Sequence, residues 1–127
     1  MSYLCEYHRN RVRRSVAAAQ HLWADALWRG ERAYWQGEWR RAGDYFGLAF
    51  TVAKLRLDDV SRGLMSGFGD FRLLQSCSYF RETMRHVDCL DEAEVALRFT
   101  CRHVRARAVE KQMTAENKNL LGEMIAR

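Results

Sequence analysis

Small and aromatic residues recur at helical spacing between Gly30 and Ala49, and this segment constrains the fold more than any other part of the chain. If residues 26–36 form a helix, small side chains follow one another every three or four positions along one face, so a second helix can approach closely. Gly37 then interrupts the pattern, and a second run of small and aromatic residues follows it. Because the connection is short, the two segments are predicted to pack as an antiparallel helical hairpin. The residues that define this predicted hairpin are Gly30, Tyr34, Gly37, Trp39, Ala42, Phe46 and Ala49.

Helical periodicity continues on both sides of this hairpin. Apolar residues recur at helical spacing from Val16 to Tyr34 and again from Leu90 to Ala108, and the C-terminal segment has a similar apolar side. No segment of the sequence has the alternation of apolar and polar residues that is typical of a strand. With 127 residues, the chain is long enough for one hydrophobic core. The sequence therefore predicts a single all-α domain over residues 1–127, arranged as an array of antiparallel hairpins or as an irregular five-helix bundle.

The middle of the chain is rich in glycine, which weakens its helical pattern. Asp58 and Asp59 stand where the N-cap of a third helical region is expected. Each glycine inside a helix costs about 1 kcal/mol relative to alanine, so residues 66–70 are predicted to form a turn or a kink. We expect Asp70 to cap the helix that continues to His86.

The predicted hairpin resembles the tetratricopeptide repeat, a pair of antiparallel helices of about 34 residues. The resemblance covers residues 23–56 and rests on the glycine of the first helix, the glycine and the aromatic residue at the turn, and the alanine and aromatic residues of the second helix. Two positions depart from the family pattern: the first-helix aromatic is displaced to Tyr34, and Lys54 replaces the usual proline. A weaker second copy is placed near residues 74–107. In that copy the turn and second-helix positions are taken by Asp88, Leu90, Ala93 and Leu97.

The resemblance implies a non-catalytic protein that binds a segment of a protein partner. Small bacterial tetratricopeptide-like proteins of this size include chaperones of secretion apparatus components. The resemblance therefore also implies a bacterial secretion-type chaperone as one context for this chain.

The four tryptophans lie close together in the sequence, but their positions on a helix differ too much for all of them to face one core. At about 100° per residue, Trp28 and Trp35 share a phase that lies roughly 120° to 140° away from the core stripe. Two interpretations remain open. The rings form a surface that anchors a partner, or their helix is central and buried on two sides. The partner-binding surface would consist of Ala24, Trp28, Glu31 and Trp35.

Arginine-rich segments offer a second kind of binding surface. The chain has 21 basic and 16 acidic residues, for a formal net charge of +5. Arg98, Arg102 and Arg105 lie on one helical face, where they are candidates for contacts to an anionic partner such as the phosphates of a nucleic acid. The alternative is an ordinary solvated face near a helix C-terminus. Because acidic residues are interleaved with the basic ones, a protein partner is favoured over nucleic acid.

No catalytic, cofactor or metal site is expected. The sequence lacks a glycine-rich phosphate loop and the common nucleophile and zinc-binding motifs. His86 and Cys89, followed by Cys101 and His103, are of the residue types that bind zinc. Residues two apart on a helix point about 160° away from each other, so Cys101 and His103 are not expected to reach one ion.

The favoured function is that of a cytoplasmic adaptor or chaperone that captures a protein segment without catalysis. Residues 1–14 have no apolar core of a signal peptide, and no apolar run approaches the roughly 18 residues of a membrane span. Four scattered cysteines do not suggest a disulfide scaffold, which favours a reducing compartment. A nucleic-acid-associated regulator and a structural subunit of a larger assembly remain as alternatives, and self-association stays open.

Overall fold

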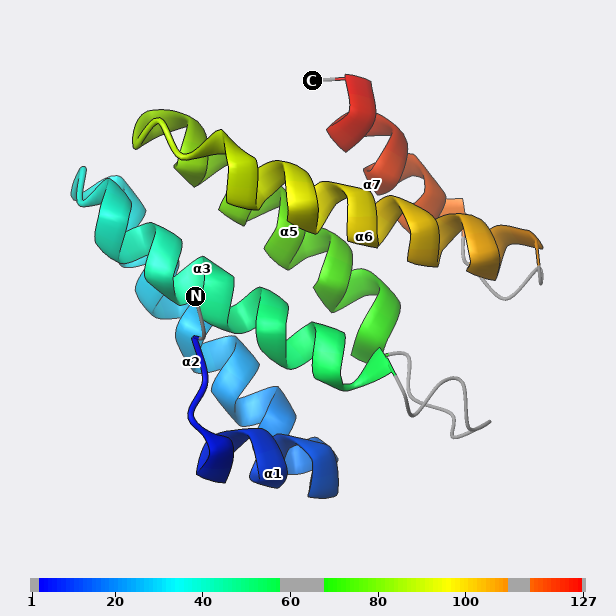
Figure 1. Cartoon of the computed structure of the whole chain (residues 1–127), viewed down its shortest axis with the longest axis horizontal. Coiled ribbons are helices and arrows are strands. Elements are labelled where there is room, and N and C mark those ends of the chain that lie inside the picture. The colour runs from blue at the N-terminus through cyan, green and yellow to red at the C-terminus, as the bar shows by residue number, and fades with distance from the viewer. Residues whose placement is uncertain (1–2, 58–67, 110–114, 127) are drawn as a thin grey trace.

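The computed structural model describes residues 3–57, 68–109 and 115–126, and every regular element in these ranges is a helix (Figure 1). The all-α prediction is therefore confirmed. The described ranges contain six helices, one more than the five-helix alternative, because Ser15 separates a short first helix from the second. Its backbone is extended (φ −134°), and its hydroxyl accepts a hydrogen bond from the Ala18 N–H at 3.1 Å, as an N-cap does. The helices are α1 (Glu6–Arg14), α2 (Val16–Trp35), α3 (Trp39–Leu55), α5 (Phe68–His86), α6 (Leu90–Val109) and α7 (Ala115–Ala126).

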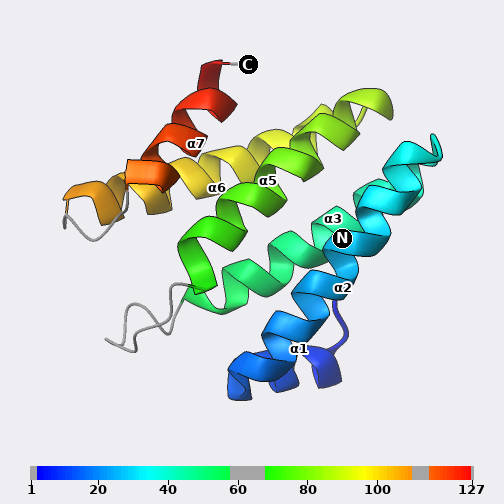
Figure 2. The ribbon, with the colours of Figure 1, turned by 180° about the vertical axis from the view of Figure 1, so that it is seen from behind.

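The helices pack mainly against their neighbours along the chain. Helix α2 pairs with α3, α3 also packs against α5, and α5 pairs with α6 (Figures 1 and 2). At one end, α1 packs on α2 and α3, and at the other end α7 packs on α5 and α6. The buried Arg56 guanidinium, just after α3, donates hydrogen bonds from Nη1 to the carbonyls of Val12 and Arg13 at 3.1 and 3.0 Å. These bonds hold the end of α1 against the end of α3.

Close approach between α2 and α3 depends on glycine. A Cβ atom at Gly30 would lie 2.6 Å from Cε1 of Phe46, whose ring is fully buried on the facing helix. Ala42 and Ala49 are also fully buried on α3. The small residues of the predicted hairpin thus lie in the helix interface, and the Phe46 ring fills the space that the missing side chain of Gly30 leaves.

The two helical hairpins close with the same turn. At the α2–α3 turn, Gly37 has φ of 76°, and the N–H of the next residue bonds to the Ala33 carbonyl at 2.9 Å. At the α5–α6 turn, Asp88 has φ of 57°, and the N–H of the next residue bonds to the Met84 carbonyl at 3.1 Å. Both are helix ends with a left-handed residue just after the helix. Asp88 therefore takes the same backbone position at its turn that Gly37 takes at the first turn. The second turn lies farther along the chain than one repeat of about 34 residues, so the tetratricopeptide assignment stays a prediction.

The glycine-rich middle of the chain differs from the expectation. Asp58 and Asp59, the predicted N-cap, lie outside the described residues. Helix α5 already begins at Phe68, so Asp70 lies inside its first turn, and the prediction that Asp70 precedes the helix is wrong.

Cys77 makes the stability of this core dependent on pH. Its side chain is fully buried in α5, and burial raises the pKa of the thiol from 9.0 to about 11. Above about pH 9 the thiol of the unfolded chain ionises while the folded one stays protonated, so stability present below this pH is lost as the pH rises. Between about pH 8 and about pH 10.5, we expect Cys77 to lower the free energy of unfolding by about 2 kcal/mol.

Urea unfolding of the wild type and of Cys77→Ala at the two pH values measures this contribution. The difference in unfolding free energy between the two proteins should shrink at the higher pH, because the variant lacks the thiol. Cys89→Ala is the matched control, since Cys89 is exposed. A difference between wild type and Cys77→Ala that does not change with pH would contradict the prediction.

Candidate functional site

A groove of about 520 Å³ runs between α2 and α5, with α3 as its floor and α7 at its edge. We call it the α2–α5 groove. Its apolar part includes the exposed rings of Trp35 and Phe71, which are 83% and 40% exposed, and Leu120 of α7. The complete lining consists of Glu31, Tyr34, Trp35, Phe46, Phe71, Gln75, Ser78, Tyr79, Glu82 and Leu120.

Stacked aromatic rings form the floor of the groove. The ring of Phe46 stacks on that of Tyr79, with centroids 4.9 Å apart and an angle of 15° between the planes. Burial, together with the nearby negative charge of Glu31 and a hydrogen bond to it, raises the pKa of the Tyr79 phenol. The phenol therefore stays protonated and donates to Glu31. This contact links the α5 wall of the groove to its α2 wall.

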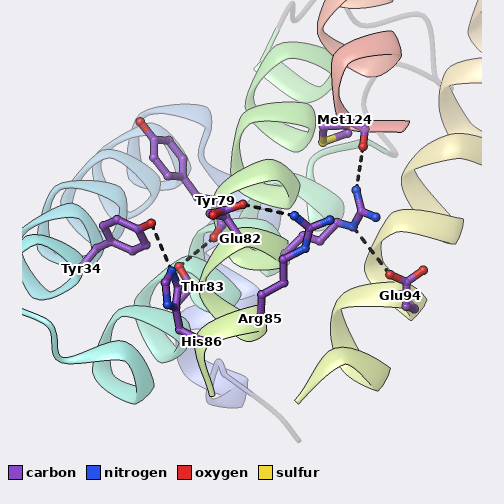
Figure 3. A network of polar contacts seen from close by, with 9 residues as sticks. Tyr34, Tyr79, Glu82, Thr83, Arg85, His86, Glu94 and Met124 are labelled. Carbon is purple, nitrogen blue, oxygen red and sulfur yellow. Dashed lines mark hydrogen bonds and ion pairs between the residues drawn. The ribbon is translucent and has the colours of Figure 1, made fainter. Parts of the chain in front are cut away.

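Aromatic contacts also fix the end of the groove nearest the α2–α3 turn. The rings of Trp39 and His86 stack at 4.1 Å with an angle of 11°, and Tyr34 meets both edge-on. Figure 3 shows the Tyr34 hydroxyl directed at His86, whose Nε2 lies 3.5 Å away. Trp35 extends from this cluster, edge-on to Tyr34 at 5.6 Å. These ring contacts attach the C-terminus of α5 to the α2–α3 hairpin. The contact with Tyr34 holds Trp35 at the groove.

The charged residues that line the α2–α5 groove are both acidic. Glu31 contributes a carboxylate from α2, and Glu82 contributes one from α5. Glu82 also lies 3.7 Å from Arg85, an exposed pair one turn along α5 (Figure 3). Exposed pairs of this kind are weak, so Glu82 can still interact with an incoming cation. Although the chain as a whole is basic, this groove presents negative charge.

The structure divides the predicted partner-binding surface between different sites. Glu31 and Trp35 line the α2–α5 groove, whereas Trp28, which is 56% exposed, lines a separate hollow between α2 and α3. Ala24 is exposed and lines neither. Because both tryptophan rings are largely exposed, the alternative in which they are core residues is wrong. A single surface made of these four residues stays a prediction. At Trp28, the guanidinium carbon of Arg32 lies 5.1 Å from the ring centroid.

The predicted arginine face of α6 lies away from these hollows. Arg98, Arg102 and Arg105 are exposed and line neither the α2–α5 groove nor the hollow at Trp28. Arg98 lies 3.4 Å from the Glu94 carbonyl one turn earlier. Arg81 of α5, by contrast, reaches the Glu94 carboxylate at 3.6 Å and the Met124 carbonyl at 2.6 Å (Figure 3). It links α5 to α6 and α7, whereas the predicted α6 arginines point to solvent.

A third hollow, of about 350 Å³, lies between α3 and α6 and contains Tyr3. The Tyr3 ring packs against Gly47, where a Cβ atom would lie 2.6 Å from the ring. Its hydroxyl donates a hydrogen bond to Glu92 at 2.8 Å. Burial, followed by the hydrogen bond to Glu92, raises the pKa of this phenol. Tyr3 therefore lines the hollow as a neutral side chain.

Sequence reasoning missed the wall that α5 contributes to the α2–α5 groove. Phe71, Gln75, Tyr79 and Glu82 follow one another at intervals of three or four residues, so they share one helical face. This stripe was a usable signal, because its aromatic and polar residues differ from the apolar stripe of the buried face.

No protein-family model, curated protein or solved structure matches this chain. In the described residues, no group of three or more His, Cys, Asp or Glu side chains is placed to hold a metal ion. Within the same ranges, no helix is long and apolar enough to cross a membrane.

Proposed function

We propose that this protein is a non-catalytic adaptor or chaperone that binds a protein segment in the α2–α5 groove. The observation that carries the proposal is the position of Trp35, which is 83% exposed beside an aromatic-floored groove of about 520 Å³. Exposed aromatic rings at the edge of a concave apolar surface are typical of residues that dominate binding energy.

The charges of the groove indicate which segments fit it. An apolar side chain of the partner can pack on the exposed rings of Trp35 and Phe71, displacing water from apolar surface. The carboxylates of Glu31 and Glu82 then favour a lysine or arginine nearby and disfavour an acidic segment. The proposed partner is therefore a protein segment that combines apolar residues with basic ones.

Selection from a displayed library of random peptides tests this function. Peptides retained by the wild type should be enriched in apolar residues combined with lysine or arginine. For a retained peptide, Trp35→Ala is expected to raise the dissociation constant at least about thirtyfold, which corresponds to about 2 kcal/mol. The dissociation constants are measured by isothermal titration calorimetry.

Trp28→Ala is the matched control, because Trp28 is an exposed tryptophan of the same helix that lines a different hollow. We expect this variant to change the dissociation constant less than about threefold. Enrichment of acidic peptides, or an equal loss of affinity in the two variants, would count against the proposed groove.

A further inference from the structure

The hollow between α2 and α3 combines three guanidinium groups with two aromatic rings. It has a volume of about 240 Å³ and shares no lining residue with the α2–α5 groove. Two of the arginines come from α2 and one from α3, so the hairpin brings together side chains that are distant in the sequence. The residues that matter for this argument are Trp28, Arg29, Arg32, Arg41 and Tyr45.

Two of these arginines line the hollow beside Tyr45, one from each helix. Arg41, and then Arg29, lower the pKa of the Tyr45 phenol. Guanidinium groups on two different helices thus favour negative charge in this hollow. This arrangement suits an oxyanion, since guanidinium groups form paired hydrogen bonds with carboxylate and phosphate oxygens.

The acidic residues near the hollow do not fully neutralise it. Asp25 lies 3.0 Å from Arg29, and Glu38 lies 3.5 Å from Arg41, but both pairs are substantially exposed. Such pairs are weak and can exchange for a more highly charged ligand. Within the described part of the chain, Arg32 has no ion pair and lies over the Trp28 ring.

We propose that this hollow binds one nucleotide, through its phosphate group and its flat base. The phosphate lies between Arg29 and Arg41 beside the Tyr45 hydroxyl, where its oxygens replace weaker acceptors. The ring stacks on the exposed face of Trp28, as bases do on aromatic side chains in single-strand-binding proteins. Arg32, displaced from the tryptophan, becomes a third donor to the phosphate.

Two sources share this ligand chemistry, a free mononucleotide and a nucleotide unit of a single strand. Isothermal titration calorimetry of the full chain at low salt, with four probes, distinguishes these two sources. The probes are adenosine monophosphate, adenosine, inorganic phosphate and a short oligoadenylate. We expect the monophosphate to bind at least about tenfold more tightly than adenosine or phosphate alone, because it engages both parts of the site. If oligoadenylate binds more than about tenfold better than the monophosphate, through the same residues, the source is a single strand. If the two probes bind equally well, the source is the mononucleotide.

Matched variants connect the binding to this hollow. Arg29→Gln combined with Arg41→Gln is expected to weaken monophosphate binding at least about tenfold, and Trp28→Leu should remove the advantage of the monophosphate over inorganic phosphate. The controls are Arg98→Gln with Arg102→Gln on α6, and Trp35→Leu in the α2–α5 groove, and we expect them to change affinity less than about twofold. All of these side chains are exposed, so circular dichroism should show unchanged folding.

Monophosphate binding no tighter than that of inorganic phosphate would overturn the proposal. The same conclusion would follow from an equal loss of affinity in the α6 double variant, since general attraction to a basic surface would then explain the binding. Because Trp28, Arg29 and Arg41 do not line the α2–α5 groove, either result leaves the proposed capture of a protein segment unaffected.

Discussion

Replacing Phe46 with alanine is expected to lower the free energy of unfolding by about 3 to 5 kcal/mol. The ring is fully buried, fills the space opposite Gly30 and stacks on Tyr79, so its removal leaves a cavity where three helices meet. Because α2, α3 and α5 are held together at this point, the cavity cannot close without moving a helix. Urea unfolding with an unchanged m-value measures the loss.

Phe71→Ala provides a control for the loss of an aromatic side chain. Phe71 lies on α5 and is 40% exposed, so we expect its replacement to cost less than about 1 kcal/mol. A similar small loss for Phe46→Ala would mean that the ring does not fill the contact between α2 and α3.

Replacing Gly30 with leucine is expected to lower the free energy of unfolding by about 3 kcal/mol, because the new side chain has no room. Its first atom alone would lie 2.6 Å from Cε1 of Phe46. Shifting the ring would disturb the stack with Tyr79, and shifting the helix would separate α2 from α3. The melting temperature and the urea midpoint both report the change.

Gly122 offers a matched glycine for the control. It lies on α7 in open space, where an added Cβ atom meets nothing within 4 Å. Gly122→Leu is expected to leave stability unchanged or to raise it by up to about 1 kcal/mol, since glycine is a poor helix former. In addition, the smaller change Gly30→Ala should be partly compensated by Phe46→Leu, since contacting residues do not act additively. If Gly30→Leu and Gly122→Leu have the same effect, the close packing of α2 on α3 is refuted.

The parts of the fold that depend on local patterns were predictable from the sequence. Small residues at helical spacing indicated the close contact of α2 with α3, and Gly37 marked their turn because a left-handed residue is needed there. The start of α5 was not predictable from its glycines, since a glycine in the first turn and a glycine in a loop give the same signal. The apolar stripe that begins at Val16 indicated the start of α2, but it did not identify Ser15 as the N-cap.

Only one side of the candidate groove was predictable. The phase of α2 indicated that Trp35 and Glu31 lie outside the core, and both line the groove. The identity of the opposite wall depends on which helix lies beside α2, and this contact between distant segments leaves no local pattern. Trp28 shares the phase of Trp35, but it lines a different hollow, in which Arg32 lies over its ring, and helical phase does not describe this contact.

The order in which the helices pack also has a consequence for how the chain folds. Since most helix contacts join neighbours in the sequence, little chain entropy is lost in closing the loops between them, which favours rapid folding. Helices α3 and α5 each pack against several other helices, whereas α7 packs, among the described helices, only on α5 and α6. The amide hydrogens of α3 and α5 should therefore be the slowest to exchange with solvent, and α7 can open while the α2–α3 hairpin remains closed.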